Sequence, residues 1–205
     1  MATNGTSREV WSCPLNSTGR YSVEVLRKKI DKPGEDSPKL ITWCKEIPIK
    51  VLGFVWKAAH DRIPSAIALL ARGVHVNSSA CDRCGAEETA EHILITCPTA
   101  VKVRNWIADW VQVNLSCISS ITDLLLFMNQ WGRCPKKRCT LTMIIYGLLW
   151  RLWKNRNERR FDKRVNSDSR ILDDIMAMVF IWRKHRTNFG RCDWQYWCIS
   201  PFSDL

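Results

Sequence analysis

Segments that would direct the chain to or through a membrane are missing from the sequence. No apolar run approaches the roughly 18 residues that a bilayer-spanning helix needs. The polar N-terminus, residues 1–10, lacks the apolar centre of a signal peptide. We therefore expect a protein that is not secreted and not bound to a membrane, located in the nucleus or the cytoplasm. The 10 cysteines should then be reduced, which favours metal binding and burial over disulfides.

Signatures of catalysis are missing as well. There is no Tyr-x-Asp-Asp run, and no group of Asp and Glu residues has a spacing suited to two-metal nucleotidyl transfer or RNase H chemistry. A cysteine-dependent enzyme would need a cysteine paired with a histidine, and no spacing outside residues 81–97 supports such a pair. We predict that the chain is not itself an enzyme.

The composition describes a globular, strongly basic chain. The sequence has 205 residues, of which 46% are hydrophobic, enough for one large domain or two small ones with a substantial core. Lys and Arg number 31 against 20 Asp and Glu, which gives a formal net charge of +11. Such an excess favours a polyanionic partner, for which nucleic acid is the first interpretation and an anionic membrane surface the competing one.

Residues 81–97 contain the most informative pattern in the chain. The pattern is C-x2-C-x7-H-x4-C, and three thiols with one imidazole can close a tetrahedron around one Zn²⁺. Because all four ligands would come from the protein, such an ion would be structural rather than catalytic. We predict one structural zinc ion held by Cys81, Cys84, His92 and Cys97.

Local signals around these four residues agree with a metal-binding loop. Gly85 follows the second cysteine, where a positive φ would turn the backbone toward the sulfurs. Thr89 can cap a short helix that carries the histidine in its first turn, and Pro98 stops that helix. The competing interpretation is a chance grouping of buried thiols and a surface histidine. A disulfide between the first two cysteines is disfavoured because so short a loop strains the bridge.

Apolar spacing along the rest of the chain predicts a mainly α-helical fold. Helices are expected over residues 48–60, 64–72, 98–110, 121–128, 141–161 and 170–186, with a basic break at 133–138. Alternating residues on both sides of a turn cluster predict a small β-hairpin over 10–23. The expected fold is therefore a helical domain with an N-terminal β-hairpin and a zinc-stapled loop between helices.

Several short motifs together resemble a known domain. They are Tyr21-Ser22-Val23, Pro48-Ile49-Lys50-Val51, Phe54-Val55-Trp56, Arg62-Ile63-Pro64-Ser65, Arg72-Gly73 and the four-ligand segment. This set resembles the reverse transcriptase zinc-binding domain at the C-terminal end of plant LINE-type (non-LTR) retrotransposon polyproteins. Trp150-x2-Trp153-Lys154-x-Arg156-Asn157-x3-Phe161 resembles the stretch that commonly follows it. Ser65 stands where the family usually has Thr.

The resemblance implies an accessory module of an RNA-directed DNA polymerase, in which upstream endonuclease and polymerase domains carry the catalysis. It suggests a disordered N-terminus (1–9), a zinc-binding domain (10–113), a helical extension with a long basic helix (114–190) and an aromatic tail (191–205). The chain would be a module detached from its polymerase. A non-functional retroelement fragment is an alternative.

Basic residues predict contacts with RNA or single-stranded DNA that depend little on sequence, because phosphate contacts need chiefly Lys and Arg density. The candidates are Arg62, Arg72, Arg83, Lys102, Arg104, Lys154, Arg156, Arg159 and Arg160. A further basic run is 136–138. Trp106 and Trp110 are the nearest candidates for stacking on bases, although core packing is the favoured role of each tryptophan.

The competing interpretation of the same surface is a protein-interaction module. In that case Trp-rich and apolar surfaces would dock on the upstream reverse transcriptase domain, and the charge would serve solubility. One basic stripe beside the zinc would favour nucleic acid, whereas scattered basic residues would favour the interaction module. The remaining cysteines, including Cys134, Cys139 and Cys198, match no compact metal motif and are interpreted as buried or incidental thiols.

Overall fold

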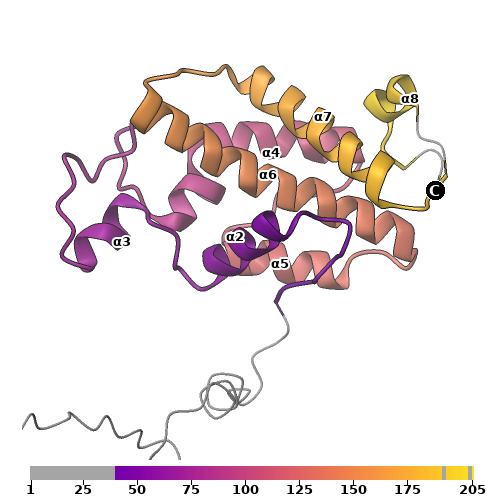
Figure 1. The fold of residues 1–205 in the computed structure, drawn as a ribbon, viewed down its shortest axis with the longest axis horizontal. Helices are drawn as coiled ribbons and strands as arrows, with labels where there is room; N and C mark the ends of the chain where they lie inside the picture. Colours follow the sequence, from indigo (N-terminus) through magenta and orange to yellow (C-terminus); the bar gives the residue numbers. More distant parts are fainter. Residues whose placement is uncertain (1–39, 191–192, 203–204) are drawn as a thin grey trace, which may run out of the picture. The chain divides into compact units, whose positions relative to one another are not determined.

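The long helix α6 (Pro135–Asp162) is the element against which most other helices pack (Figure 1). The computed structural model describes residues 40–190, 193–202 and 205. The remaining elements, in chain order, are α2 (Ile49–Ala59), α3 (Ala66–Ala71), η1 (His92–Thr96), α4 (Pro98–Val111), α5 (Ile121–Gln130), α7 (Asp168–Arg186) and α8 (Trp194–Ile199). Helices α2, α4, α5 and α7 and the turn η1 all contact α6.

The middle of α6 is apolar all round, and it is buried all round. Leu141, Ile145 and Leu149 are each 0% exposed, as are most residues between them. A helix with no polar face must be enclosed, and this explains why neighbours surround α6. The expectation of a buried first half and a more polar, basic second half is confirmed.

The start of α6 corrects one expectation from the sequence. The predicted break at 133–138 is wrong, because α6 already begins at Pro135 and includes the basic run. Proline suits the first helical turn, where its missing N–H has no partner to lose. Lys136 and Lys137 therefore lie on the first turn of the helix rather than in a loop.

Helix α7 lies close against α6 at Gly147. A Cβ atom built on this glycine would lie 2.8 Å from Cγ2 of Val179, closer than side chains tolerate. Only glycine permits this approach, and the pair α6 and α7 forms the largest helix contact of the described residues.

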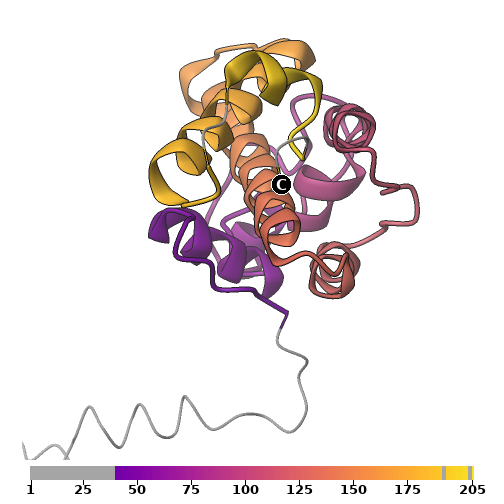
Figure 2. The same cartoon turned by 90° about the vertical axis from the view of Figure 1, so that its right-hand side faces the viewer.

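The C-terminal aromatic segment is anchored to the helical core. Trp197 of α8 is fully buried, and its indole N–H donates to the carbonyl of Met176 on α7 at 3.1 Å. Trp110 of α4 meets the Trp197 ring edge-on, with ring centroids 5.1 Å apart. Figure 2 shows α8 beside the end of α7. The tail is thus joined to the core through Trp197, whereas the domain boundaries expected from the sequence stay predictions.

The mainly α-helical class is confirmed for the described residues. The β-hairpin predicted over 10–23 and the N-terminus 1–9 lie outside them. In residues 40–190, 193–202 and 205 no strand forms, and an isolated antiparallel bridge joins Ala80 to Glu87. None of the helices described has the length and apolarity to cross a membrane.

Candidate metal centre

A tight loop presents the first two cysteines of the four-ligand segment. The bridge between Ala80 and Glu87 closes its base, and the amide of Cys81 donates to the carbonyl of Ala86 at 2.7 Å. Gly85 donates back to the carbonyl of Cys81 at 2.9 Å with a φ of +78°. The positive φ expected at this glycine is confirmed, and it turns the chain back directly after Cys84.

The wide turn η1 presents the other two ligands. Thr89 caps it, because its hydroxyl accepts from the amide of His92 at 3.0 Å. The amide of Cys97 donates to the carbonyl of His92 at 2.8 Å, a bond that spans five residues and makes the turn π-helical. In an α-helix, residues five apart point roughly 140° away from each other. The wider turn brings His92 and Cys97 to the same side.

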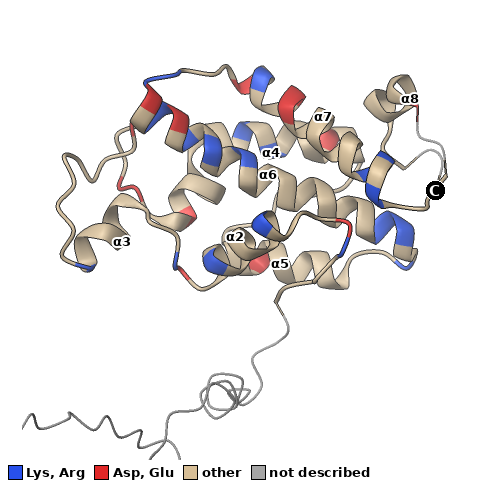
Figure 3. Cartoon of the chain, viewed as in Figure 1, with Lys and Arg blue, Asp and Glu red and all other residues tan. Residues whose placement is uncertain are grey.

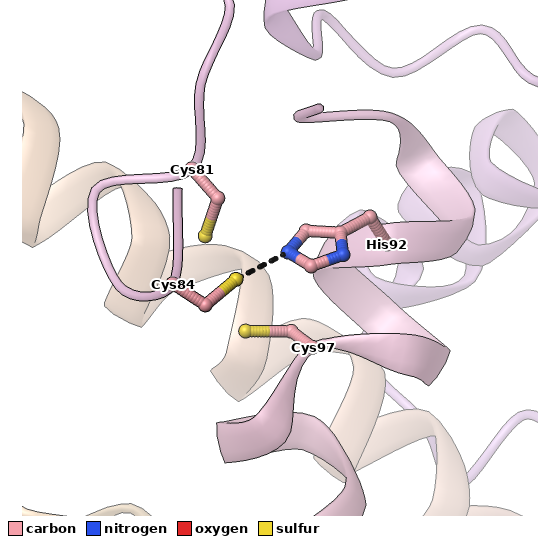
Figure 4. Close-up of side chains that lie close together, drawn as sticks. All are labelled: Cys81, Cys84, His92 and Cys97. Atoms are coloured by element: carbon pink, nitrogen blue, oxygen red, sulfur yellow. Dashed lines mark hydrogen bonds between the residues drawn. The ribbon is translucent and has the colours of Figure 1, made fainter. Parts of the chain in front are cut away.

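The four side chains converge at one point between the loop and η1 (Figure 4). Their three sulfurs and one ring nitrogen all lie within 4.8 Å of one another. Nε2 of His92 faces Sγ of Cys84 at 3.2 Å, whereas Nδ1 lies 3.4 Å from the hydroxyl of Thr96. The ring is thus held with one nitrogen toward the sulfurs and the other toward a polar neighbour, as in metal-binding histidines.

The protonation of the thiols reflects their crowding. A hydrogen bond from Cys97 lowers the pKa of the Cys81 thiol to about 4, although burial opposes the shift. The same bond, together with burial, raises the pKa of Cys97. At neutral pH Cys81 is therefore a thiolate that accepts the proton of Cys97. Thiolate is the form that binds metal ions.

This donor set fits zinc. Tetrahedral Zn²⁺ with Zn–S distances near 2.3 Å and Zn–N distances near 2.1 Å separates its ligand atoms by roughly 3.5 to 3.8 Å. The observed spread up to 4.8 Å includes that range. Cys81, Cys84, His92 and Cys97 would hold the ion, and a site with four protein ligands offers no open position for catalysis. When bound, zinc would link the loop to η1 and to the start of α4.

A buried carboxylate ties the zinc segment to α6. Glu88 is 1% exposed and forms ion pairs with Arg156 and with Arg160, the latter at 3.3 Å. Its carboxylate also accepts from the amide of Ala66, the first residue of α3, at 3.2 Å. One side chain thus joins the zinc segment, α3 and the basic half of α6.

A second buried carboxylate, Asp168, ties the loop to α7. It is 9% exposed and pairs with Arg83, which lies between the two loop cysteines, at 2.9 Å. It also pairs with Lys102 of α4 at 3.3 Å. The loop therefore contacts the N-terminus of α7 through a charge pair that is largely shielded from solvent.

The nine basic candidates divide into two groups. Five have intramolecular partners that give them a structural role: Arg83 and Lys102 bind Asp168, Arg156 and Arg160 bind Glu88, and Arg104 donates to the carbonyl of Ile95 at 2.8 Å. The other four are more available for a ligand. They are Arg62, Arg72, Lys154 and Arg159.

Each of these four has a distinct setting. Arg62 is exposed, with its guanidinium 5.3 Å from the Trp56 ring centroid. Arg72 is exposed at the end of α3. Lys154 makes a loose 4.0 Å contact with Glu158. Arg159 lines a cavity of about 40 Å³ together with Cys81 and Cys97, and so lies beside the metal centre.

The stacking candidates have partners inside the protein. Trp106 is half-buried with the ammonium of Lys102 5.0 Å from its ring centroid. Trp110 donates to the carbonyl of Trp197 at 3.1 Å. Packing explains both rings, and neither carries a nucleic-acid argument further.

Reasoning from the sequence missed Glu88 and Asp168. Glu88 stood beside Thr89 in the motif, but a single acidic residue in a polar segment carries no sign of burial. Asp168 follows Ser167, which caps α7 through a hydroxyl that accepts from Arg170 at 3.2 Å. That position suggests a helix start and no more, because the pairing partners come from distant segments.

Comparison with known families supports the metal assignment. Residues 21–106, less than half of the chain, match the family model described as zinc-binding in reverse transcriptase. All four ligands lie inside the matched region. No curated protein and no solved structure matches the chain.

Proposed function

We propose that this chain is a zinc-stabilised accessory module of a retrotransposon reverse transcriptase, of the plant LINE or non-LTR type, that binds RNA or single-stranded DNA. The observation that carries the proposal is the Cys81–Cys84–His92–Cys97 cluster inside a region that matches the family of zinc-binding domains in reverse transcriptases. The module itself performs no catalysis, which is supplied by the polymerase that it serves. Its position in the cell follows that polymerase, in the nucleus or the cytoplasm.

Nucleic-acid binding is assigned to basic side chains near the zinc segment that are not held by buried carboxylates. Arg72 and Arg159 are the strongest candidates, since no ion pair engages either of them within the described part of the chain. The net charge of +11 draws a polyanion to the surface, and phosphate contacts would be largely independent of sequence.

A titration of the full chain with fluorescent oligouridine at several salt concentrations tests this function. The affinity should fall steeply with salt. Replacing Arg72 and Arg159 with Gln should reduce the slope of log K against log salt by about 0.7 per lost phosphate contact. Lys136→Gln is the matched control, because it removes one charge at the opposite end of α6, on the order of 35 Å away. Absence of binding at low salt, or an affinity that does not change with salt, contradicts the proposal.

A second candidate is a protein-interaction module that docks on the reverse transcriptase domain. Its support is the distribution of charge, since Lys and Arg lie at both ends of α6 rather than in one stripe beside the zinc (Figure 3). A groove of about 620 Å³ between α2, α6 and α7 also exposes Ile181, which is 55% exposed.

Pull-down with a purified polymerase domain separates the two candidates. Ile181→Glu should abolish capture if the groove docks on the polymerase, and it should leave the binding of oligouridine unchanged. Capture that depends on Arg72 and Arg159 instead would contradict docking through this groove.

A further inference from the structure

Three possible metal ligands converge outside the zinc segment. Sγ of Cys44 lies 3.3 Å from Sγ of Cys139 and 2.9 Å from Oε2 of Glu46. The three donor atoms lie within 4.8 Å of one another. Cys44 and Glu46 belong to the segment before α2, whereas Cys139 lies in the second turn of α6.

The segment that carries Cys44 is held firmly in place. Thr42 donates from its amide to the hydroxyl of Tyr146 at 3.1 Å and from its own hydroxyl to the side chain of Asn129 at 2.7 Å. Asn129 in turn donates to the carbonyl of Leu40 at 3.3 Å. The segment is thus fixed to α5 and α6 before any ion binds. Ligands held in advance lose little freedom on binding.

A tight turn then places the carboxylate beside the thiol. The amide of Ile47 donates to the carbonyl of Cys44 at 3.1 Å, and Glu46 lies within this turn. Cys44 is 9% exposed, and Cys139 and Glu46 are half-buried. All three donors are therefore partly shielded from water, where attraction to a cation is stronger than at the surface.

The chemistry of these donors favours a zinc-class ion. Thiolates select soft or borderline ions, and a carboxylate is an accepted third ligand of zinc. No Lys or Arg among the described residues forms an ion pair with Glu46, so a divalent cation would supply the missing positive charge. The closest donors are 3.3 Å and 2.9 Å apart, similar to the 3.2 Å between Cys84 and His92 in the first cluster.

We propose that Cys44, Glu46 and Cys139 form a second site for a divalent ion of the zinc class. Three protein ligands leave a fourth position to water, so this site would be open and would hold its ion less tightly than the closed site. The ion would fasten the segment before α2 to the start of α6. This proposal does not depend on nucleic-acid binding.

Metal analysis of the full chain, purified with a reductant and without chelator, tests the second site. We expect about two zinc ions per chain. Cys139→Ser and Cys84→Ser should each lower the content to about one, because each removes a different site. Cys117→Ser is the matched control, since this exposed cysteine lies in neither cluster, and it should retain both ions. A single ion that Cys84→Ser removes, or a content that Cys139→Ser leaves unchanged, overturns the proposal.

Two further measurements protect the test against misfolding and against a disulfide. Glu46→Gln keeps both sulfurs and should weaken binding of the second ion at least about tenfold in competition with a coloured chelator; unchanged affinity contradicts the carboxylate ligand. Intact mass without reductant should show all thiols free. A loss of two hydrogens that disappears in Cys139→Ser would mean that the two sulfurs form a disulfide, and it would overturn the metal site.

Discussion

Glu88, directly after the loop of the metal centre, is ion-paired to Arg156 of α6 across 68 residues of chain. The carboxylate is 1% exposed, and the guanidinium also lies 5.0 Å from the Trp153 ring centroid. An arginine that the sequence suggested for phosphate contacts is thus largely enclosed by the protein. Its pairing with Glu88 makes the zinc segment continuous with the core.

Replacement of Glu88 by Gln should destabilise the protein strongly. The change leaves the charges of Arg156 and Arg160 without their buried partner, and removal of one member of a buried ion pair typically costs about 3–5 kcal/mol. Urea denaturation followed by circular dichroism measures the change. Glu87→Gln is the control, because this neighbour is exposed and its loss should alter stability by less than about 0.5 kcal/mol. Equal effects of the two variants would show that the buried pair is not stabilising.

Removal of zinc should lower the melting temperature. Binding energy at a structural site is folding energy, and a loss of about 3 kcal/mol corresponds to roughly 6–12 °C for a chain of this size. Cys84→Ser should produce most of the same decrease and should make the protein less sensitive to chelator. Differential scanning fluorimetry with and without chelator gives both numbers. Cys117→Ser should behave as the unaltered protein, and a melting curve that ignores the chelator would contradict a structural role for the ion.

Gly147→Ala should destabilise the pairing of α6 with α7. The added methyl group would meet Val179 at 2.8 Å, and overpacking of this kind costs about 1–3 kcal/mol. Gly53→Ala in α2 is a matched control because nothing lies within 4 Å of its Cβ position. That substitution should stabilise the helix by up to about 1 kcal/mol. Chemical denaturation should therefore give opposite signs for the two glycines.

Trp197→Ala should release the C-terminal segment. Truncation of a fully buried tryptophan costs about 3–5 kcal/mol, and here it also removes the contacts with Trp110 and Met176. Limited proteolysis should then cut the chain near residue 190 before the core is digested. Tyr196→Ala on the same helix is the control, because its side chain is 67% exposed and its loss should leave the digestion pattern unchanged.

The sequence predicted those features that depend on neighbouring residues. The helices expected from apolar spacing are present, and the compact C-x2-C-x7-H-x4-C pattern places all four donors together. Gly85 takes the positive φ that its position suggested. Each of these features is set within a few residues of chain, where spacing, capping and turn preferences act directly.

Features that depend on distant segments were not accessible from the sequence. Lysine and arginine density could not show that Arg156 and Arg160 face a buried carboxylate, because the ion pair joins residues about 70 positions apart. The approach of Cys44 to Cys139 across 95 positions is a product of packing in the same way. Local pattern finds such residues but not their partners.

The π-helical form of η1 also fixes how the chain tolerates changes in length. His92 and Cys97 face the same side only because a turn of five residues separates them. A deletion or insertion of one residue between them would rotate the last cysteine by roughly 100° and move its sulfur away from the other three donors. Substitutions within this turn are therefore a lesser hazard to the metal centre than a shift of one position in its register.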